Sequence, residues 1–182
     1  MADDFNRRIE RYLDELYRWN DKMNLTTVLR GKAADVLVTP SLAMAEFLEG
    51  LPEGARVCDI GAGGGIPGIV LALRLPALSF SLVESNVKKS VFLSHVASEL
   101  GLSNVAVVNR HTESMRADAE FAQAADAVVA RAVNRKHVFE AAEYLLKPGG
   151  LLLVHRSEHG PEMQPRFAAG NKNEFVESYI LQ

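Results

Sequence analysis

The stretch Asp59-Ile60-Gly61-Ala62-Gly63-Gly64-Gly65-Ile66-Pro67-Gly68 decides the fold class of this chain. It overlaps the end of a short apolar strand pattern at residues 56–61 and leads into an apolar segment, residues 66–76, that reads as a helix. Glycines let a chain turn sharply and let a ligand approach its backbone. The first turn of the next helix presents free N–H groups and a partial positive charge. The stretch therefore predicts a nucleotide-type site at the carboxyl end of a strand, where open α/β sheets bind ligands.

Strand and helix patterns alternate beyond this loop as well. Further strands are expected at 79–85, 104–109, 126–131, 149–155 and 175–181, and helices at 86–100 and 134–147. Residues 112–123 fit either a short helix or a loop. Such alternation is typical of a parallel sheet built from right-handed crossovers. We therefore expect an α/β fold with a Rossmann-like sheet.

The residues before the sheet read as a helical N-terminal extension, residues 1–50. Residues 3–24 carry apolar side chains at three- and four-residue spacing, as an amphipathic helix does. Within this helix, Tyr12 and Trp19 are expected to pack in the core rather than to stack on bases. A second helix is expected at 33–49. With 182 residues the chain fits one domain, residues 1–182, whose Rossmann-like core spans 55–182.

Composition narrows the class of protein. A hydrophobic content of 48% with 24% charged residues is ordinary for a soluble globular chain, and the longest apolar stretches are too short to span a membrane. A single cysteine, Cys58, excludes a disulfide scaffold, and residues 1–10 show no secretory segment, so we expect a cytoplasmic protein. We also expect a monomer. The net charge of −3 is not the overall footprint of a nucleic-acid binder, so RNA would have to bind a local basic patch.

The loop predicts a cofactor as well as a turn. The pattern Asp59-x-Gly61-x-Gly63-x-Gly65 places an acid before the first glycine, where it can pair with the ammonium group of S-adenosylmethionine (SAM), directly or through water. Glu84, at the end of the second expected strand, is placed to bind the ribose hydroxyls. We therefore expect the Rossmann-like sheet of the class I SAM-dependent methyltransferases.

Two other interpretations of the loop remain. Gly63-x-Gly65-x-x-Gly68 also fits the pattern of dinucleotide-binding proteins, with Glu84 on the ribose. An acid before the glycines adds negative charge beside a pyrophosphate, which disfavours that ligand. The third interpretation is a tight turn without a ligand, which four glycines within five positions disfavour.

Five short stretches occur in an order that resembles one family. They are Trp19-Asn20-x-x-x-Asn24-Leu25-Thr26, the glycine loop with its helix at 59–73, Lys88-Lys89-x-x-Phe92-Leu93, Asn109-Arg110 and Ala130-Arg131-Ala132. Over roughly residues 10–157 the chain resembles the RsmG methyltransferases, also called glucose-inhibited division protein B (GidB). The resemblance implies methyl transfer from SAM to N7 of a guanine in 16S ribosomal RNA. The implied partner is this RNA or the small ribosomal subunit, and no metal and no membrane are expected.

The resemblance also assigns roles residue by residue. It implies that the contacts to SAM fall on Gly61, Ile66, His111, Thr112 and Arg131. The basic residues that serve the RNA or the guanine fall on Lys88 or Lys89, Arg110, Arg131 and Arg156, the last of which stands where the family usually has lysine. We expect Arg131, Arg110 and Arg156 to act on the reacting guanine, with Arg131 placing the base. The alternative for Arg131 is a salt bridge to Asp126 or Glu84.

Two basic pairs are expected to guide RNA phosphates. Lys88-Lys89 and Arg135-Lys136 lie near expected helix starts on the ligand edge of the sheet. The alternative for both pairs is a solvated charge without a ligand.

Besides Arg156, the chain departs from the family at three places. The family usually has an Arg-His-x-x-Asp-Ser segment, whereas the matching stretch here, residues 38–44, reads Val-Thr-Pro-Ser-Leu-Ala-Met and lacks the His and the Asp. The acidic pair after the third strand is replaced by His111-Thr112-Glu113, which alters the expected contact to adenine. The family's closing strand pair is expected to be incomplete, because the chain stops soon after 175–181.

The residues favour an acceptor that needs no deprotonation. Guanine N7 carries an accessible lone pair, so an enzyme that methylates it needs position and electrostatics more than a base. A pyrimidine-C5 enzyme needs a cysteine nucleophile, but Cys58 lies inside an expected strand. An amino-group methyltransferase of the common type carries Asn/Asp-Pro-Pro after the fourth strand, where this chain has residues 130–134, Ala-Arg-Ala-Val-Asn.

Three further alternatives compete with this function: a zinc site, another enzyme of the same lineage and a non-catalytic protein. His155-Arg156-Ser157-Glu158-His159 matches an inverted zinc motif, but that site needs a helix and this stretch follows a strand pattern. A second alternative is a SAM-dependent enzyme of the same lineage with another RNA or a small-molecule acceptor. A third is a non-catalytic SAM-binding protein associated with the ribosome.

Overall fold

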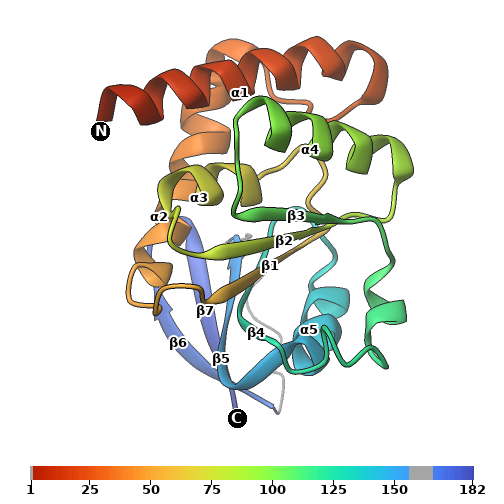
Figure 1. Ribbon diagram of the computed structural model, residues 1–182. Coiled ribbons are helices and arrows are strands. Elements are labelled where there is room, and N and C mark those ends of the chain that lie inside the picture. Colours follow the sequence, from red (N-terminus) through yellow and green to blue (C-terminus); the bar gives the residue numbers. More distant parts are fainter. Residues whose placement is uncertain (1, 156–165) are drawn as a thin grey trace.

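The computed structural model describes residues 2–155 and 166–182. These residues contain one seven-stranded sheet with helices packed against it (Figure 1). The strands are β1 (Arg56–Ile60), β2 (Ser79–Val83), β3 (Val105–Val108), β4 (Ala125–Ala130), β5 (Leu146–His155), β6 (Phe167–Lys172) and β7 (Val176–Leu181). Their order across the sheet is β3-β2-β1-β4-β5-β7-β6. The pairs among β1–β5 are parallel, whereas β7 runs antiparallel to both β5 and β6.

Helices cover both faces of the sheet (Figure 1). In chain order they are α1 (Ala2–Met23), the 3-10 turn η1 (Arg30–Lys32), the π-helical turn η2 (Ala34–Val38), α2 (Thr39–Leu48), α3 (Gly68–Arg74), α4 (Val87–Glu99), the 3-10 turn η3 (Thr112–Met115) and α5 (Arg135–Leu145). One face carries α3 and α4, with α1 outside them and α2 beside α3. The other face carries α5 and η3.

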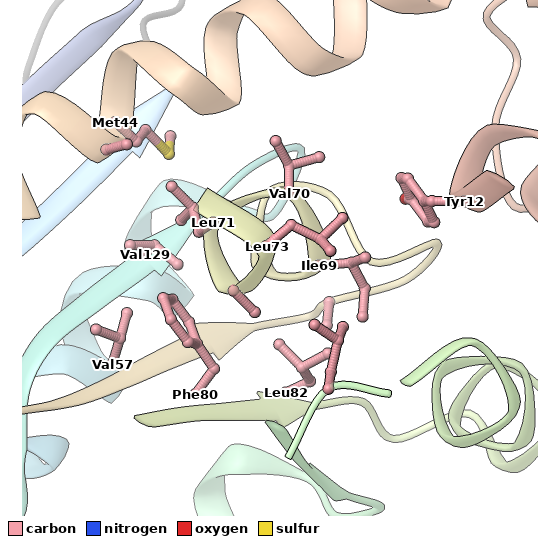
Figure 2. Close-up of a cluster of buried hydrophobic side chains, with 14 of the residues drawn as sticks. Tyr12, Met44, Val57, Ile69, Val70, Leu71, Leu73, Phe80, Leu82 and Val129 are labelled. Atoms are coloured by element: carbon pink, nitrogen blue, oxygen red, sulfur yellow. The ribbon is translucent and has the colours of Figure 1, made fainter. Parts of the chain in front are cut away.

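The N-terminal extension is part of the main hydrophobic core. Residues 68–73 of α3 are buried on every side, because the sheet covers one side of this helix and α1 and α2 cover the other. Figure 2 shows this arrangement, with Met44 of α2 and Tyr12 of α1 on one side and Phe80 and Leu82 of the sheet on the other. Burial of this apolar surface on both sides drives the extension and the sheet to fold together.

Most of the predicted elements are confirmed. The helix expected at 33–49 begins instead with the π-helical turn η2, and the undecided stretch 112–123 contains the short turn η3. Trp19 and Tyr12 pack in the core as predicted: Tyr12 is fully buried, and the Trp19 ring lies 5.6 Å from the Phe92 ring.

The expectation of an incomplete closing strand pair is wrong. β6 and β7 pair from Phe167 with Leu181 to Lys172 with Glu177, so both strands are present. The sequence of β6, Phe-Ala-Ala-Gly-Asn-Lys, carries no β-branched residue and gives no alternating pattern, which is why this strand was not predicted.

None of the described helices is long and apolar enough to span a bilayer.

Candidate functional site

The register of the sheet brings three strand ends to one edge. Ile60, the last residue of β1, pairs with Val83 at the end of β2 and with Ala130 at the end of β4. The residues that follow, Gly61, Glu84 and Arg131, therefore leave the sheet side by side. This edge is the carboxyl end of the parallel strands, where α/β sheets bind their ligands.

The glycine loop turns tightly above this edge. The backbone N–H groups of Gly61 and Ala62 both donate to the Val83 carbonyl, at 2.9 and 3.0 Å. Gly61, Gly63 and Gly65 have left-handed φ angles of 68°, 54° and 89°, which L-residues rarely adopt. A Cβ atom on Gly61 would lie 2.7 Å from the Val133 side chain. The loop therefore requires glycine for its backbone path, and it exposes peptide groups to a ligand.

Glu84 holds the far side of the loop. Its carboxylate accepts hydrogen bonds from the Gly63 N–H at 2.9 Å and from the Asn86 N–H at 2.8 Å. The side chain is buried, so these two bonds offset the cost of removing the charge from water. Each carboxylate oxygen keeps a free lone pair, so the predicted contact to ribose hydroxyls stays a prediction compatible with this geometry.

Asp59 lies beneath the loop instead of in its wall. Its Oδ2 accepts a hydrogen bond of 2.9 Å from the Gly68 N–H at the start of α3, and its Oδ1 has no hydrogen-bond partner among the described residues. Burial raises the pKa of Asp59 to about 7, the Gly68 bond opposes the shift, and the nearby Glu84 carboxylate adds to it. Because Asp59 does not line either cavity of the site, its contact with an ammonium group remains a prediction.

A cleft of about 370 Å³ separates the glycine loop from the segment that follows α1. One wall is the loop, Gly61–Gly64, and the other is Asn24–Val28. The remaining lining residues are Leu16, Leu37, Ile66, Lys89, Arg131 and Ala132. Lys89 and Arg131 are the titratable side chains among these lining residues, so the cleft is cationic.

The Trp-Asn-x-x-x-Asn-Leu-Thr motif builds the second wall. Trp19 anchors the end of α1 against α4, and Asn24 takes a left-handed φ of 50° that turns the chain away from the helix. The side-chain Oδ1 of Asn20 then accepts a hydrogen bond of 2.8 Å from the Thr26 N–H. The motif thus fixes the path of residues 24–28 along the cleft.

Arg131 joins the sheet edge to the extension. Its guanidinium donates to the Val36 carbonyl at 2.7 Å and, at 3.5 Å, to the Leu37 carbonyl. Burial lowers its pKa, yet arginine keeps its charge in proteins. The alternative of a salt bridge to Asp126 is wrong, because that carboxylate binds the Lys147 ammonium at 2.5 Å and the Arg56 N–H. Glu84 binds backbone N–H groups instead, as described above.

A second cavity of about 190 Å³ lies on the other side of Gly61. Its lining includes the predicted residues His111 and Thr112, together with Ser85, Val133 and His137. The hydroxyl Oγ1 of Thr112 lies 2.9 Å from the Nε2 of His137, which fixes the side chain of this buried threonine. Gly61 lines both cavities, so the two lie next to each other at the carboxyl end of β1.

Two arginines that were predicted to bind RNA or guanine have internal partners. Arg110 binds the Asp118 carboxylate at 2.6 Å and the Ser114 carbonyl at 2.8 Å. Arg135 binds the Glu177 carboxylate at 2.9 Å and the Tyr179 hydroxyl at 2.7 Å.

The predicted lysines are accessible. Lys88 is exposed, Lys89 lines the cleft, and Lys136 is exposed, 3.8 Å from Glu140. Arg156 lies outside the described residues.

The structure also describes Cys58 and part of the zinc motif. Cys58 is buried in β1, and burial raises the pKa of its thiol to about 12, as expected of a core residue. Residues 156–159 of the zinc motif lie outside the described residues. Among residues 2–155 and 166–182, no three His, Cys, Asp or Glu side chains cluster as metal ligands would.

Several site residues were not predicted. Leu16, Leu37, Ala132 and the segment 25–28 line the cleft, and the hydroxyl of Tyr12 donates to the Gly64 carbonyl at 2.6 Å. The apolar spacing in α1 places Tyr12 in the core, but it carries no signal for the carbonyl that its hydroxyl meets.

Solved structures share this fold. A putative methyltransferase from Escherichia coli superimposes with a TM-score of 0.67 at 18% identity, covering 81% of this chain and 89% of that one. A SAM-dependent methyltransferase from Aquifex aeolicus has a TM-score of 0.59 at 15% identity and covers 93% and 97%. At these identities the likeness establishes the Rossmann-like fold.

Sequence relatives identify the family. Ribosomal RNA small subunit methyltransferase G of Nitrosococcus oceani is 40% identical over 145 residues, which are 79% of this chain and 64% of that protein. The corresponding protein of Sorangium cellulosum is 39% identical over 83% of this chain and 64% of its own length. The chain thus spans slightly under two thirds of the length of these relatives. The model of the GidB family, described as rRNA small subunit methyltransferase G, matches residues 5–177, and the chain therefore belongs to this family.

Proposed function

We propose that this chain transfers a methyl group from SAM to N7 of a guanine in 16S ribosomal RNA. The observation that carries the proposal is the cationic cleft between the glycine loop and residues 24–28. The cleft places a cofactor-type loop opposite a wall that carries Asn24, Thr26 and Thr27, where an acceptor would bind. Membership of the GidB family supports the same assignment.

The glycine loop and the two cavities fit the cofactor. SAM supplies an electrophilic methyl group on a sulfonium centre. The N–H groups of Gly61 and Gly63 already bind Val83 and Glu84. Their backbone carbonyls and the Glu84 carboxylate would therefore hold the polar parts of SAM, with Thr112 and His111 in the second cavity. Gly61 borders both cavities, and glycine is required there because a Cβ atom would lie 2.7 Å from the Val133 side chain.

The cleft suits an acceptor that loses no proton. Among the described lining residues there is no carboxylate, histidine or thiol that could act as a base. Guanine N7 has a free lone pair and requires none. A guanidinium donates readily to guanine O6, so Arg131, held by the Val36 carbonyl, is placed to orient the base. The chain contributes position and charge, which are the two terms that this reaction requires.

RNA phosphates would meet lysines at the carboxyl edge of the sheet, where α4 and α5 begin. Lys89 lines the cleft, and Lys88 and Lys136 are exposed at the starts of α4 and α5. These lysines would give RNA a local basic surface, although the net charge of the whole chain is −3. An enzyme with this substrate would act where ribosomes are assembled, which in a bacterium is the cytoplasm. All described lining residues of the cleft belong to one chain, which is compatible with a monomer.

The test uses tritiated SAM with small ribosomal subunits and with their deproteinised RNA, both from a strain that lacks its own enzyme. Label at one guanine N7 supports the proposal. Calorimetry with S-adenosylhomocysteine (SAH) measures cofactor binding separately. Binding without label would refute the ribosomal RNA assignment and favour another acceptor or a non-catalytic protein. If the protein neither binds SAH nor transfers label, the interpretation of the glycine loop as a cofactor site is refuted.

A further inference from the structure

Two tyrosines of α1 donate hydrogen bonds to carbonyls on opposite walls of the cleft. The hydroxyl of Tyr12 donates to the Gly64 carbonyl at 2.6 Å, and the hydroxyl of Tyr17 donates to the Val28 carbonyl at 2.6 Å. Leu16 lies between them in sequence and lines the cleft itself. One helix therefore contacts the glycine loop, the opposite wall and the space between them.

The contact at Gly64 leaves the glycine loop little freedom. A Cβ atom on Gly64 would lie 3.0 Å from the Leu16 side chain and 3.3 Å from the Leu25 carbonyl. Tyr12 is fully buried, and its ring packs in the core between α1 and α3 (Figure 2). Its hydroxyl thus satisfies the carbonyl of Gly64, a loop residue that packs closely against Leu16 and Leu25.

Charged residues support the contact between Tyr17 and Val28. The Arg30 guanidinium lies over the Tyr17 ring, 5.9 Å from its centroid, and binds Glu10 at 2.6 Å and Asp14 at 3.0 Å on α1. Residues 24–28 are thus connected to α1 at both ends. At the start, the Asn24 N–H donates to the Asn20 carbonyl of α1, and at the end the Tyr17 hydroxyl donates to the Val28 carbonyl. Among the described residues, the Tyr17 hydroxyl donates to this wall and the Tyr12 hydroxyl donates to the glycine loop, so each wall has its own tyrosine.

We propose that Tyr12 and Tyr17 are positioning residues that act on different ligands of the cleft. Tyr12 holds the glycine loop in the conformation that binds the cofactor. Tyr17 holds residues 24–28 in the conformation that receives the acceptor. The separation of roles rests on the proposed function, which places SAM on the glycine loop and RNA against the other wall. The N-terminal helix thereby sets the width of the cleft.

The test replaces each tyrosine with phenylalanine, which keeps the ring and removes the hydroxyl. Tyr12→Phe should raise the dissociation constant of SAH about tenfold in calorimetry, as loss of one buried hydrogen bond would, with the KM for RNA unchanged at saturating SAM. Tyr17→Phe should leave SAH binding within about twofold and raise the KM for RNA or lower kcat up to about tenfold, as loss of one partly buried hydrogen bond predicts.

A matched control separates positioning from general destabilisation. Ser178→Ala also removes a buried hydroxyl that donates to a carbonyl, that of Asn171, but it lies on β7 away from the cleft. This variant should lose thermal stability to a similar degree and keep the wild-type dissociation constant for SAH and KM for RNA. The proposal is overturned if the two tyrosine variants change the same constants, if neither changes any, or if Ser178→Ala reproduces their effects.

Failure of the proposed function gives a different result. If the wild-type protein binds SAH but methylates no ribosomal RNA, the role of Tyr17 toward that acceptor is refuted together with the proposed function. The role of Tyr12 is then still decided by SAH calorimetry alone. If Tyr12→Phe binds SAH as the wild type does, the role of Tyr12 is refuted even where methyl transfer is intact.

Discussion

Arg131, which follows β4, donates a hydrogen bond of 2.7 Å to the backbone carbonyl of Val36 in the π-helical turn η2. A π-helical turn widens the helix and leaves carbonyl groups poorly paired, and such turns occur frequently at functional sites. The bond links the end of a core strand to the N-terminal extension across the cleft. It also fixes the direction of a charged group that the proposed function assigns to the guanine.

Substitution of Arg131 by lysine should impair methyl transfer although it keeps the charge. An ammonium group lacks the planar fork that reaches the Val36 carbonyl while other N–H groups face the cleft. We expect kcat/KM to fall at least about tenfold, which corresponds to about 1.4 kcal/mol of transition-state stabilisation. Steady-state kinetics with tritiated SAM measure this. Arg74→Lys, in an exposed pair with Glu49, is the control, and equal activity of the two variants would contradict the prediction.

Substitution of Gly64 by alanine should damage both stability and cofactor binding. The added methyl group would lie 3.0 Å from Leu16 and 3.3 Å from the Leu25 carbonyl, and a backbone atom cannot move away cheaply. Overpacking of this kind costs about 1–3 kcal/mol, which chemical denaturation measures. Gly31→Ala meets no atom within 4 Å and should leave stability and SAH binding near the wild-type values. A Gly64→Ala variant as stable as Gly31→Ala would show that the walls are looser than described.

The fold was largely predictable from the sequence because the central elements carry strong local signals. Apolar runs bounded by glycine and proline predicted β1 and α3, and the glycines that require left-handed φ angles marked the loop between them. The missed strand β6 depends on pairing with β7, so its existence is a tertiary property that its own residues do not signal.

The candidate site was predictable in composition but not in detail. Residue type places Asp59 beside a ligand, whereas the fold turns its carboxylate toward the Gly68 N–H. In the same way, the charge of Arg135 suggests RNA, but β7 supplies Glu177 as its partner. Such partners come from segments distant in sequence, and a single sequence does not reveal which segments meet.

Substitution of Ala132 by glycine should raise stability and lower activity. Ala132 follows Arg131 and has a left-handed φ of 57°, which costs an L-residue roughly 1–2 kcal/mol. Glycine relieves this strain, partly offset by its greater freedom in the unfolded chain, so we expect a gain of up to about 1 kcal/mol in the free energy of unfolding. It also loosens the turn that carries Arg131, which should reduce kcat. Ala127→Gly, in the middle of β4, should only destabilise; a loss of stability in Ala132→Gly would contradict the strain argument.

Substitution of Cys58 by alanine should leave methyl transfer intact. The thiol is buried in β1 and its pKa is raised to about 12 by burial, so no thiolate is available as a nucleophile near neutral pH. We expect iodoacetamide to leave the folded wild-type protein unlabelled at pH 8, as mass spectrometry would show, and to label it in urea. Loss of activity in a folded Cys58→Ala variant would reopen a covalent mechanism.

Asp59 should make stability depend on pH between about 4 and 7. Burial raises the pKa of this carboxyl from 3.8 to about 7 in the folded protein. In this pH window the folded state therefore binds more protons than the unfolded state, so the free energy of unfolding falls as pH rises. A shift of about three units corresponds to at most about 4 kcal/mol, lost by pH 8 and fully retained below pH 4.

Asp59→Asn isolates this contribution, because an amide oxygen can accept the Gly68 N–H bond as the carboxylate does. The amide of this variant resembles the protonated carboxyl of Asp59, because in both groups the polar atom at the Oδ1 position is a donor without a partner among the described residues. The stability of the variant should therefore match that of the wild type near pH 4. Above pH 7 it should be more stable, since no charge is buried. Urea denaturation at pH 5, 6, 7 and 8 measures the difference. The exposed Asp21→Asn should leave the wild-type slope in place. A parallel pH dependence of Asp59→Asn and the wild type would mean that another group titrates, whereas convergence of the two at low pH would identify the buried carboxyl beneath the glycine loop.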